Sequence, residues 1–220
     1  MATISQIPLD EYLGASYRPD REYVDGEIRE RNVGKWEHAR VQWLLALWFG
    51  THEKEWGITG STEQRVRVAE NRVRVPDLVV LTAGAQPDVL IDPPLLIIEI
   101  LSPDDSYSDT QERAQDYRSM GVETVWIIDP KTRTGRMCSG KEWIEATRLE
   151  VKGTSLFVDL PEIFSHVDCG LRTARPAKIP RSQKRDLGRL ASADGVFPRG
   201  ETSGAGSYQA ARMCVVALSE

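Results

Sequence analysis

The chain has 220 residues, of which 40% are hydrophobic and 28% charged, with six Trp and a formal net charge of −5, a composition that suits one globular domain or one domain with a tail. It has no apolar run of eighteen residues, and Met1 to Asp10 lacks a basic segment followed by an apolar one, so neither a membrane span nor a secretory signal is predicted. Three widely spaced cysteines argue against a disulfide framework and favour a cytoplasmic protein.

A hairpin and a helix are the first elements predicted along the chain. Residues 22–28 (EYVDGEI) centre on Asp25-Gly26, a dipeptide that favours a type I′ turn. Residues 36–49 repeat apolar side chains at steps of three and four, which predicts a helix packed on a sheet. Its apolar face is predicted to consist of Ala39, Trp43, Leu44, Leu47 and Trp48.

Three strands, a second helix and a fourth strand are predicted next. The three strands span residues 63–68, 73–81 and 95–101, the helix spans residues 109–120 before Gly121, and the last strand spans residues 122–128. Further short strands are expected between residues 136 and 158. The order α-β-β-β-α-β predicts an α/β (α+β) domain with a central mixed sheet flanked by helices.

The distribution of charge predicts a boundary after residue 171. Residues 172–220 carry nine Lys or Arg against four Asp or Glu, a net charge of +5, whereas residues 1–171 carry nineteen against twenty-nine, a net charge of −10. The second segment has no Trp and no sustained helix or strand period. We therefore predict a domain over residues 1–171 and a basic, mostly disordered tail over residues 172–220.

One predicted strand contains an ionisable residue, Glu99, within LLIIEIL. Burying a carboxylate costs several kcal/mol unless a cation or hydrogen bonds compensate. If this strand is an antiparallel neighbour of residues 73–81 with Leu81 opposite Leu95, Asp77 lies opposite Glu99. Two carboxylates in that position repel each other. A divalent cation such as Mg²⁺ would remove the conflict, because it binds carboxylate oxygens and water.

The same residues also have explanations without a metal. A salt bridge to Arg113 would account for Glu99, because structural ion pairs occur at such positions. His38 is typical of a partly buried helix residue, and Glu37 of a first-turn charge that compensates the helix dipole. Asp88 follows a Pro as Asp77 does, but it lies among loop residues and is assigned to the opposite end of the hairpin from Glu99.

Four segments carry a resemblance to a known family. They are Val75–Val80 (VPDLVV), Leu96–Pro103 (LIIEILSP), Tyr117 before Gly121-Val122, and Val125–Pro130 (VWIIDP). In these segments the chain resembles the Uma-two family, which is similar to restriction endonucleases and belongs to the PD-(D/E)XK nuclease superfamily. The resemblance extends from about Tyr12 to about Phe164 and implies a restriction-endonuclease-like core.

The resemblance also implies a cofactor and site residues. The cofactor would be Mg²⁺, with Mn²⁺ as an alternative, and the residues would be Asp77 and Glu99 as metal ligands, Ile100 through its carbonyl, Arg113 and Glu37. The superfamily Lys would stand two positions after Glu99, where this chain has Leu101. The position from which the family supplies a Lys instead holds Arg113, which keeps the positive charge but does not readily lose a proton.

The predicted function is metal-dependent hydrolysis of DNA phosphodiester bonds. By analogy with this class of enzyme the protein is expected to form a homodimer, because cleavage of both strands needs two sites. One alternative is a catalytically weak or inactive nuclease-fold protein that acts as a nucleic-acid-binding or regulatory module. The presence of Arg rather than Lys at position 113 favours this alternative. Another is a metal-dependent enzyme with a non-nucleic substrate. The net charge of the domain does not favour general DNA affinity. A local basic patch is expected from Arg65, Arg67, Arg72 and Arg74. Motifs typical of nucleotide-binding loops and serine hydrolases are absent from the sequence.

Overall fold

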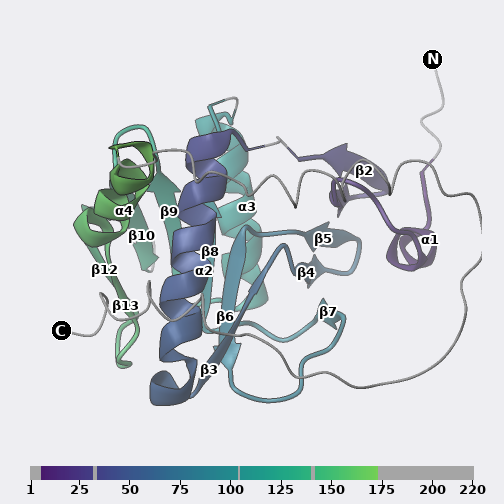
Figure 1. Cartoon of the computed structure of the whole chain (residues 1–220). Helices are drawn as coiled ribbons and strands as arrows, with labels where there is room; N and C mark the ends of the chain where they lie inside the picture. Colours follow the sequence, from purple (N-terminus) through teal and green to yellow (C-terminus); the bar gives the residue numbers. More distant parts are fainter. Residues whose placement is uncertain (1–5, 32–33, 104, 140–141, 173–220) are drawn as a thin grey trace, which may run out of the picture. The chain divides into compact units, whose positions relative to one another are not determined.

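A computed structural model describes residues 6–31, 34–103, 105–139 and 142–172, which belong to one compact unit. Figure 1 shows their arrangement. None of the helices in these ranges combines the length and the apolar composition that crossing a bilayer requires. Arg172 ends the last helix, and the rest of the predicted tail, residues 173–220, lies outside the described residues.

A mixed sheet of six strands forms the centre, in the order β11-β10-β9-β8-β6-β3. Only its β8 and β9 pair in parallel; its other neighbours are antiparallel. In chain order its strands are β3 (Ile58–Thr62), β6 (Leu78–Thr82), β8 (Leu96–Ile100), β9 (Val125–Asp129), β10 (Thr134–Ser139) and β11 (Glu142–Ala146). With the helices described below, the central sheet and its helices follow the order α2, β3, β6, β8, α3, β9, which has the predicted α-β-β-β-α-β form, but its first strand, β3, is not the predicted strand over residues 63–68.

Helices cover both faces of this sheet (Figure 1). On one face, α2 (Trp36–Trp56) packs against β8, whose Ile98 and Ile100 lie in the same buried cluster, and α4 (Leu160–Arg172) packs against α2. On the other face, α3 (Tyr107–Met120) packs against Ile97. Because side chains alternate along a strand, Glu99 points to the same face as Ile97, toward α3.

A second mixed sheet has the order β2-β1-β5-β4-β7. Its strands are β1 (Arg21–Val24), β2 (Glu27–Glu30), β4 (Arg65–Ala69), β5 (Arg72–Arg74) and β7 (Val89–Leu90). The predicted hairpin is confirmed, with positive φ of 53° at Asp25 and 95° at Gly26, as a type I′ turn requires. The remaining elements are the short helix α1 (Leu9–Gly14) and the strand pair β12 (Arg148–Glu150) and β13 (Phe157–Asp159).

The prediction of one continuous strand over residues 73–81 is wrong. The chain leaves β5 at Arg74 and enters β6 at Leu78, so the two halves lie in different sheets. Pro76 lies in the gap, and proline interrupts a ladder because it lacks an N–H and fixes φ. The predicted first strand corresponds to β4 of the second sheet, and the first strand of the central sheet, β3, was missed.

The first long helix is also longer than predicted, and a different face of it is buried. It continues to Trp56, where Gly57 ends it with a left-handed φ of 64°. Trp43 is 62% exposed and Ala39 is exposed, whereas Val41, Leu45 and Phe49 form the buried stripe with Leu44 and Trp48. The segment WLLALWF is apolar nearly all round, so its periodicity could not identify the buried face.

Candidate functional site

The register that places two carboxylates opposite each other is confirmed. β6 and β8 are antiparallel, with Leu78 opposite Ile98 and Val80 opposite Leu96. One further step along this ladder brings Asp77 opposite Glu99. Their exposed fractions are 3% and 2%, and both line the same small cavity. Two acidic side chains therefore meet where β6 begins and β8 ends.

Pro76 explains why the ladder opens at this point. Along β8 the even-numbered backbone groups face β6, because the N–H groups of Ile97 and Leu101 bond to the β9 side instead. Continuing the register brings Pro76 opposite Ile100, and Pro76 has no N–H to offer the Ile100 carbonyl. The Ile100 N–H donates to Asp77 Oδ2 at 2.7 Å. The backbone of Ile100 therefore faces the carboxylate of Asp77.

The other oxygen of Asp77 has two cationic or polar partners. Arg31 donates from a terminal nitrogen to Oδ1 at 2.6 Å, and the side chain of Arg31 is 16% exposed. His38 Nε2 lies 3.4 Å from the same oxygen, while its Nδ1 lies 3.2 Å from the Ser102 hydroxyl. Burial opposes ionisation of Asp77, but the hydrogen bond from His38 and the charge of Arg31 hold its pKa below the usual value.

Glu99 has partners from α3. Tyr117, fully buried, donates its hydroxyl to Oε1 at 2.6 Å, and Arg113 Nε lies 3.5 Å from Oε2. Burial raises the pKa of Glu99 to about 7; Arg113 opposes this rise and Asp77 adds to it. The Nε of Arg113 is buried and makes no hydrogen bond among the described residues. This N–H is available to a ligand that enters the cavity.

Four of the five predicted site residues surround one cavity. Its volume is about 10 Å³, near the minimum for one water molecule. Its lining comprises the predicted Asp77, Glu99, Ile100 and Arg113, together with Arg31, His38, Ser102 and Asp105. The fifth, Glu37, is exposed on the first turn of α2 and does not line the cavity. Asp88 is exposed just before β7, as predicted for a loop residue.

Arg31 is a site residue that sequence reasoning missed, as are Ser102 and Asp105 of the cavity lining. Arg31 lies 46 positions before Asp77, just after β2, in a segment without a motif. The tertiary fold alone brings it to the cavity. Tyr117 and His38 carried a weak signal, because each is a polar side chain at a helical position that faces the sheet. Arg113 was predicted from the family resemblance, and its ion pair with Glu99 is also the predicted explanation without a metal.

A buried ionic cluster lies next to the site and joins α3 to the second sheet. Arg74, with only 3% of its surface exposed, pairs with Glu22 of β1 at 2.7 Å, Asp116 of α3 at 2.7 Å and Glu112 of α3 at 2.9 Å. Glu22 is 4% exposed and also accepts the N–H of Val75 at 3.3 Å. Glu112 and Asp116 directly precede Arg113 and Tyr117, so this cluster positions the face of α3 that contacts Glu99.

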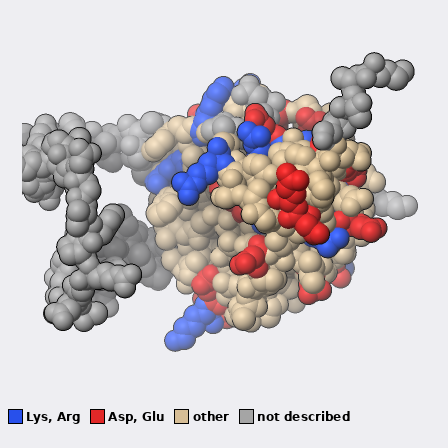
Figure 2. Space-filling view, turned by 90° about the vertical axis from the view of Figure 1, so that its right-hand side faces the viewer, with Lys and Arg blue, Asp and Glu red and all other residues tan. Residues whose placement is uncertain are grey.

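The expected basic patch is largely neutralised by the same kind of pairing. Arg65 pairs with Asp20 at 2.8 Å, and Arg72 pairs with Asp25 and Asp116. Arg74 is buried in the cluster described above. Figure 2 shows acidic and basic side chains interspersed on the side of the molecule that carries the second sheet. On that side, the charges of Arg65 and Arg72 are balanced by neighbouring carboxylates.

The donor set fits a hard divalent cation that keeps part of its water shell. Two carboxylates and a carbonyl oxygen are the ligand types that Mg²⁺ prefers. Within the described ranges, no group of three or more His, Cys, Asp or Glu side chains is placed to hold a metal ion, so water would complete the coordination. A cation at Asp77 would also have to displace Arg31, which now balances its charge.

This architecture defines a nuclease-like α/β protein. A crystal structure of a "putative nuclease belonging to DUF820" from Anabaena variabilis ATCC 29413 superposes with a TM-score of 0.63 at 23% sequence identity, covering 72% of this chain and 98% of that one. The chain belongs to the Uma2 family, described as "Putative restriction endonuclease", whose model matches residues 9–167.

The chain was also compared with a second solved structure and with curated proteins. A cryo-EM structure of a DrdV–DNA complex aligns with a TM-score of 0.34 at 14% identity, over 61% of this chain and 11% of that one. Among curated proteins, none matches the chain.

Proposed function

We propose that this protein is a metal-dependent endonuclease that hydrolyses DNA phosphodiester bonds, with Mg²⁺ or Mn²⁺ as cofactor. The observation that carries the proposal is the pairing of two buried carboxylates, Asp77 and Glu99, across β6 and β8 in one cavity. Membership of a family described as restriction endonucleases supports DNA as the substrate. Cleavage of both strands would require two sites, which a homodimer would provide.

The residues around the cavity have distinct roles in this proposal. Asp77, Glu99 and the carbonyl of Ile100 would hold the cation, which would lower the pKa of a water molecule and neutralise charge on the scissile phosphate. Tyr117 fixes the orientation of Glu99 through its 2.6 Å hydrogen bond. Arg113 Nε–H, which forms an ion pair with Glu99 but makes no hydrogen bond among the described residues, would donate to a phosphate oxygen, and this contact strengthens as charge develops in the transition state.

Arg31 lies 2.6 Å from Asp77 and acts as its counterion. A divalent cation there would repel the guanidinium, whose side chain is 16% exposed and has a second carboxylate, Glu63, 3.8 Å away. We assign to Arg31 a shift from Asp77 toward the phosphate when metal and DNA bind. An Arg is suited to that role because it binds phosphate with two parallel hydrogen bonds.

A second candidate is a nuclease-fold protein that binds nucleic acid without turnover. It is favoured by the ion pairs of Asp77 with Arg31 and of Glu99 with Arg113, which balance both carboxylates without a metal. It is also favoured by the Arg at position 113, because Arg cannot readily give up a proton to assist deprotonation of water.

Cleavage of supercoiled plasmid DNA separates the two candidates. The full chain is expected to nick the plasmid in Mg²⁺ or Mn²⁺ and to lose this activity in EDTA, and Arg113→Lys should retain or increase the rate. DNA binding without nicking in either metal, together with nicking by Arg113→Lys, would establish the second candidate instead. Absence of nicking by both proteins would reject the endonuclease proposal.

A further inference from the structure

A separate pocket lies on the same face of the central sheet as Glu99. The strand registers place Glu99 opposite Ile127 of β9, Ile127 opposite Arg136 of β10, and Arg136 opposite Glu145 of β11. Laterally paired residues point to the same face of a sheet, so these side chains form one row. Neighbouring strands are about 4.8 Å apart, so Arg136 lies about 10 Å from Glu99.

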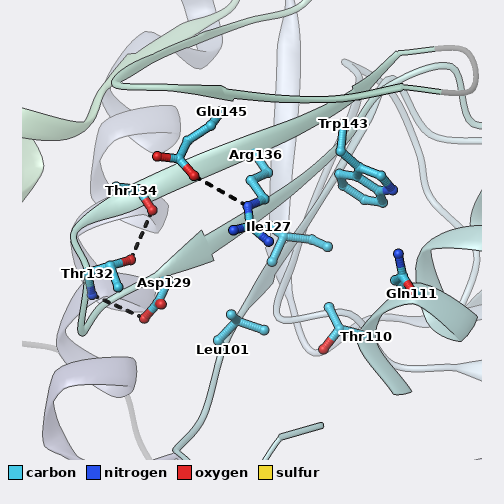
Figure 3. Close-up of a pocket in the computed structure, with 10 residues that line it drawn as sticks. All are labelled: Leu101, Thr110, Gln111, Ile127, Asp129, Thr132, Thr134, Arg136, Trp143 and Glu145. Atoms are coloured by element: carbon cyan, nitrogen blue, oxygen red, sulfur yellow. Dashed lines mark hydrogen bonds and ion pairs between the residues drawn. The ribbon is translucent and has the colours of Figure 1, made fainter. Parts of the chain in front are cut away.

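The floor of this pocket is apolar and its rim is polar. Leu101, Ile127 and Trp143 provide apolar surface, while Gln111, Arg136 and Glu145 provide polar groups at the mouth. Figure 3 shows Trp143 on the same side of the pocket as Thr110 and Gln111 of α3, with Asp129, Thr132 and Thr134 on the opposite side. Such a combination of apolar walls and a few polar groups is typical of sites for small ligands.

The size of the pocket suits one aromatic ring. Its volume is about 170 Å³, and cavities of roughly 150 Å³ bind benzene. Trp143 and Gln111 also line a second hollow of about 470 Å³ over Ala114 and Cys138. The indole therefore stands between two hollows and offers aromatic surface for stacking.

From these observations we propose that the pocket holds one unstacked nucleobase of the nucleic-acid substrate, next to the scissile phosphate at the cavity that Asp77, Glu99 and Arg113 line. The proposal deepens the proposed function and rests on a nucleic acid being its substrate. The row from Glu99 to Arg136 is about as long as one nucleotide from its phosphate to the far edge of its base. The base would stack on Trp143, and Gln111, Arg136 and Glu145 would contact its polar edge.

Leu101 connects the two sites. It follows Ile100, whose backbone N–H donates to Asp77, and precedes Ser102 of the same cavity, and its own side chain lines the pocket. A nucleotide with its phosphate at the cavity would therefore reach the pocket by crossing Leu101. The superfamily Lys position is occupied here by an apolar residue that contributes to the wall of a base-sized pocket.

Binding measured without metal tests this inference independently of cleavage. Fluorescence anisotropy in EDTA would follow a labelled single-stranded oligonucleotide and a fully abasic oligonucleotide of equal length. Trp143→Ala should bind the first about tenfold more weakly than the wild type, because stacking of one base is worth on the order of a tenfold change or more. Trp143→Phe should retain most of the affinity. The matched control is Trp43→Ala, which removes an exposed Trp from α2 on the other face of the sheet and should bind normally.

The inference is tested by whether the losses of affinity from substituting Trp143 and from removing the bases depend on each other. Removing the bases should strongly lower the affinity of the wild type for the oligonucleotide. It should lower the affinity of Trp143→Ala only slightly, because the substitution has already deleted the same contact. Trp143→Leu, which keeps apolar packing without a ring, replaces Trp143→Ala if that variant does not fold. Equal affinity of wild type and the folded variant, or equal losses on base removal, would overturn the inference even if plasmid cleavage is found. Coupled losses without cleavage would uphold it and reject turnover.

Discussion

Asp77→Asn is expected to lower metal-dependent plasmid cleavage by about 10³-fold or more, because a metal ion contributes several kcal/mol to transition-state stabilisation. Asn has nearly the same shape as Asp and keeps an oxygen that accepts the N–H of Ile100, as Asp77 does at 2.7 Å. It lacks the negative charge that a hard cation requires. Initial rates of nicking at saturating Mn²⁺ would measure the loss.

A matched control exists within the same hairpin. Asp88 follows Pro87 as Asp77 follows Pro76, but Asp88 is exposed and lies outside the cavity. Asp88→Asn should therefore cleave at the wild-type rate, whereas Glu99→Gln should lose activity as Asp77→Asn does. Cleavage by Asp77→Asn near the wild-type rate, with circular dichroism showing an intact fold, would remove Asp77 from the chemistry.

Arg74→Met should lower the free energy of unfolding by about 3–5 kcal/mol, the usual cost of removing one partner of a buried ion pair. Met replaces the aliphatic stem of the Arg side chain but not its guanidinium, and it leaves Glu22, 4% exposed, without its cationic partner. Asp116 keeps its ion pair with Arg72 at 2.8 Å, so the loss should arise mainly at Glu22. Urea unfolding followed by circular dichroism would measure it.

Two further variants make the origin of that loss testable. Arg67→Met, in the neighbouring strand, removes only a hydrogen bond to the carbonyl of Glu70 at an exposed site and should change stability by no more than about 0.5 kcal/mol. The double variant Glu22→Gln, Arg74→Met should recover part of the loss, because the buried negative charge is gone. Equal stability of Arg74→Met and wild type would show that Glu22 does not depend on Arg74 and that the cluster contributes little to stability.

The core of the site could be predicted because it depends on local patterning. An acidic residue inside an apolar strand identified Glu99, and the constant sum of positions along an antiparallel ladder identified Asp77 as its opposite residue, a register that the structure confirms. Gly121 also ends α3 as predicted, with a left-handed φ of 110°. These features are set by burial and backbone geometry over short stretches.

Features that depend on distant segments could not be predicted. Arg31 reaches Asp77 only after the second sheet has formed beside the first, and no short-range pattern specifies that contact. The break at Pro76 was read as part of one strand because the apolar alternation continues across it, although the chain changes sheets there. In α2, abundant apolar residues concealed which stripe was buried, so Trp43 was assigned to the wrong side.

The proposed function requires Asp77 and Glu99 to share one divalent cation, and calorimetric titration with Mn²⁺ tests this most directly. The wild type should show one binding event that is absent in Asp77→Asn and in Glu99→Gln and unchanged in Asp88→Asn. Arg31→Gln should bind Mn²⁺ more tightly, because the guanidinium no longer competes for Asp77. Unchanged Mn²⁺ affinity and stoichiometry in both Asp77→Asn and Glu99→Gln would contradict the account.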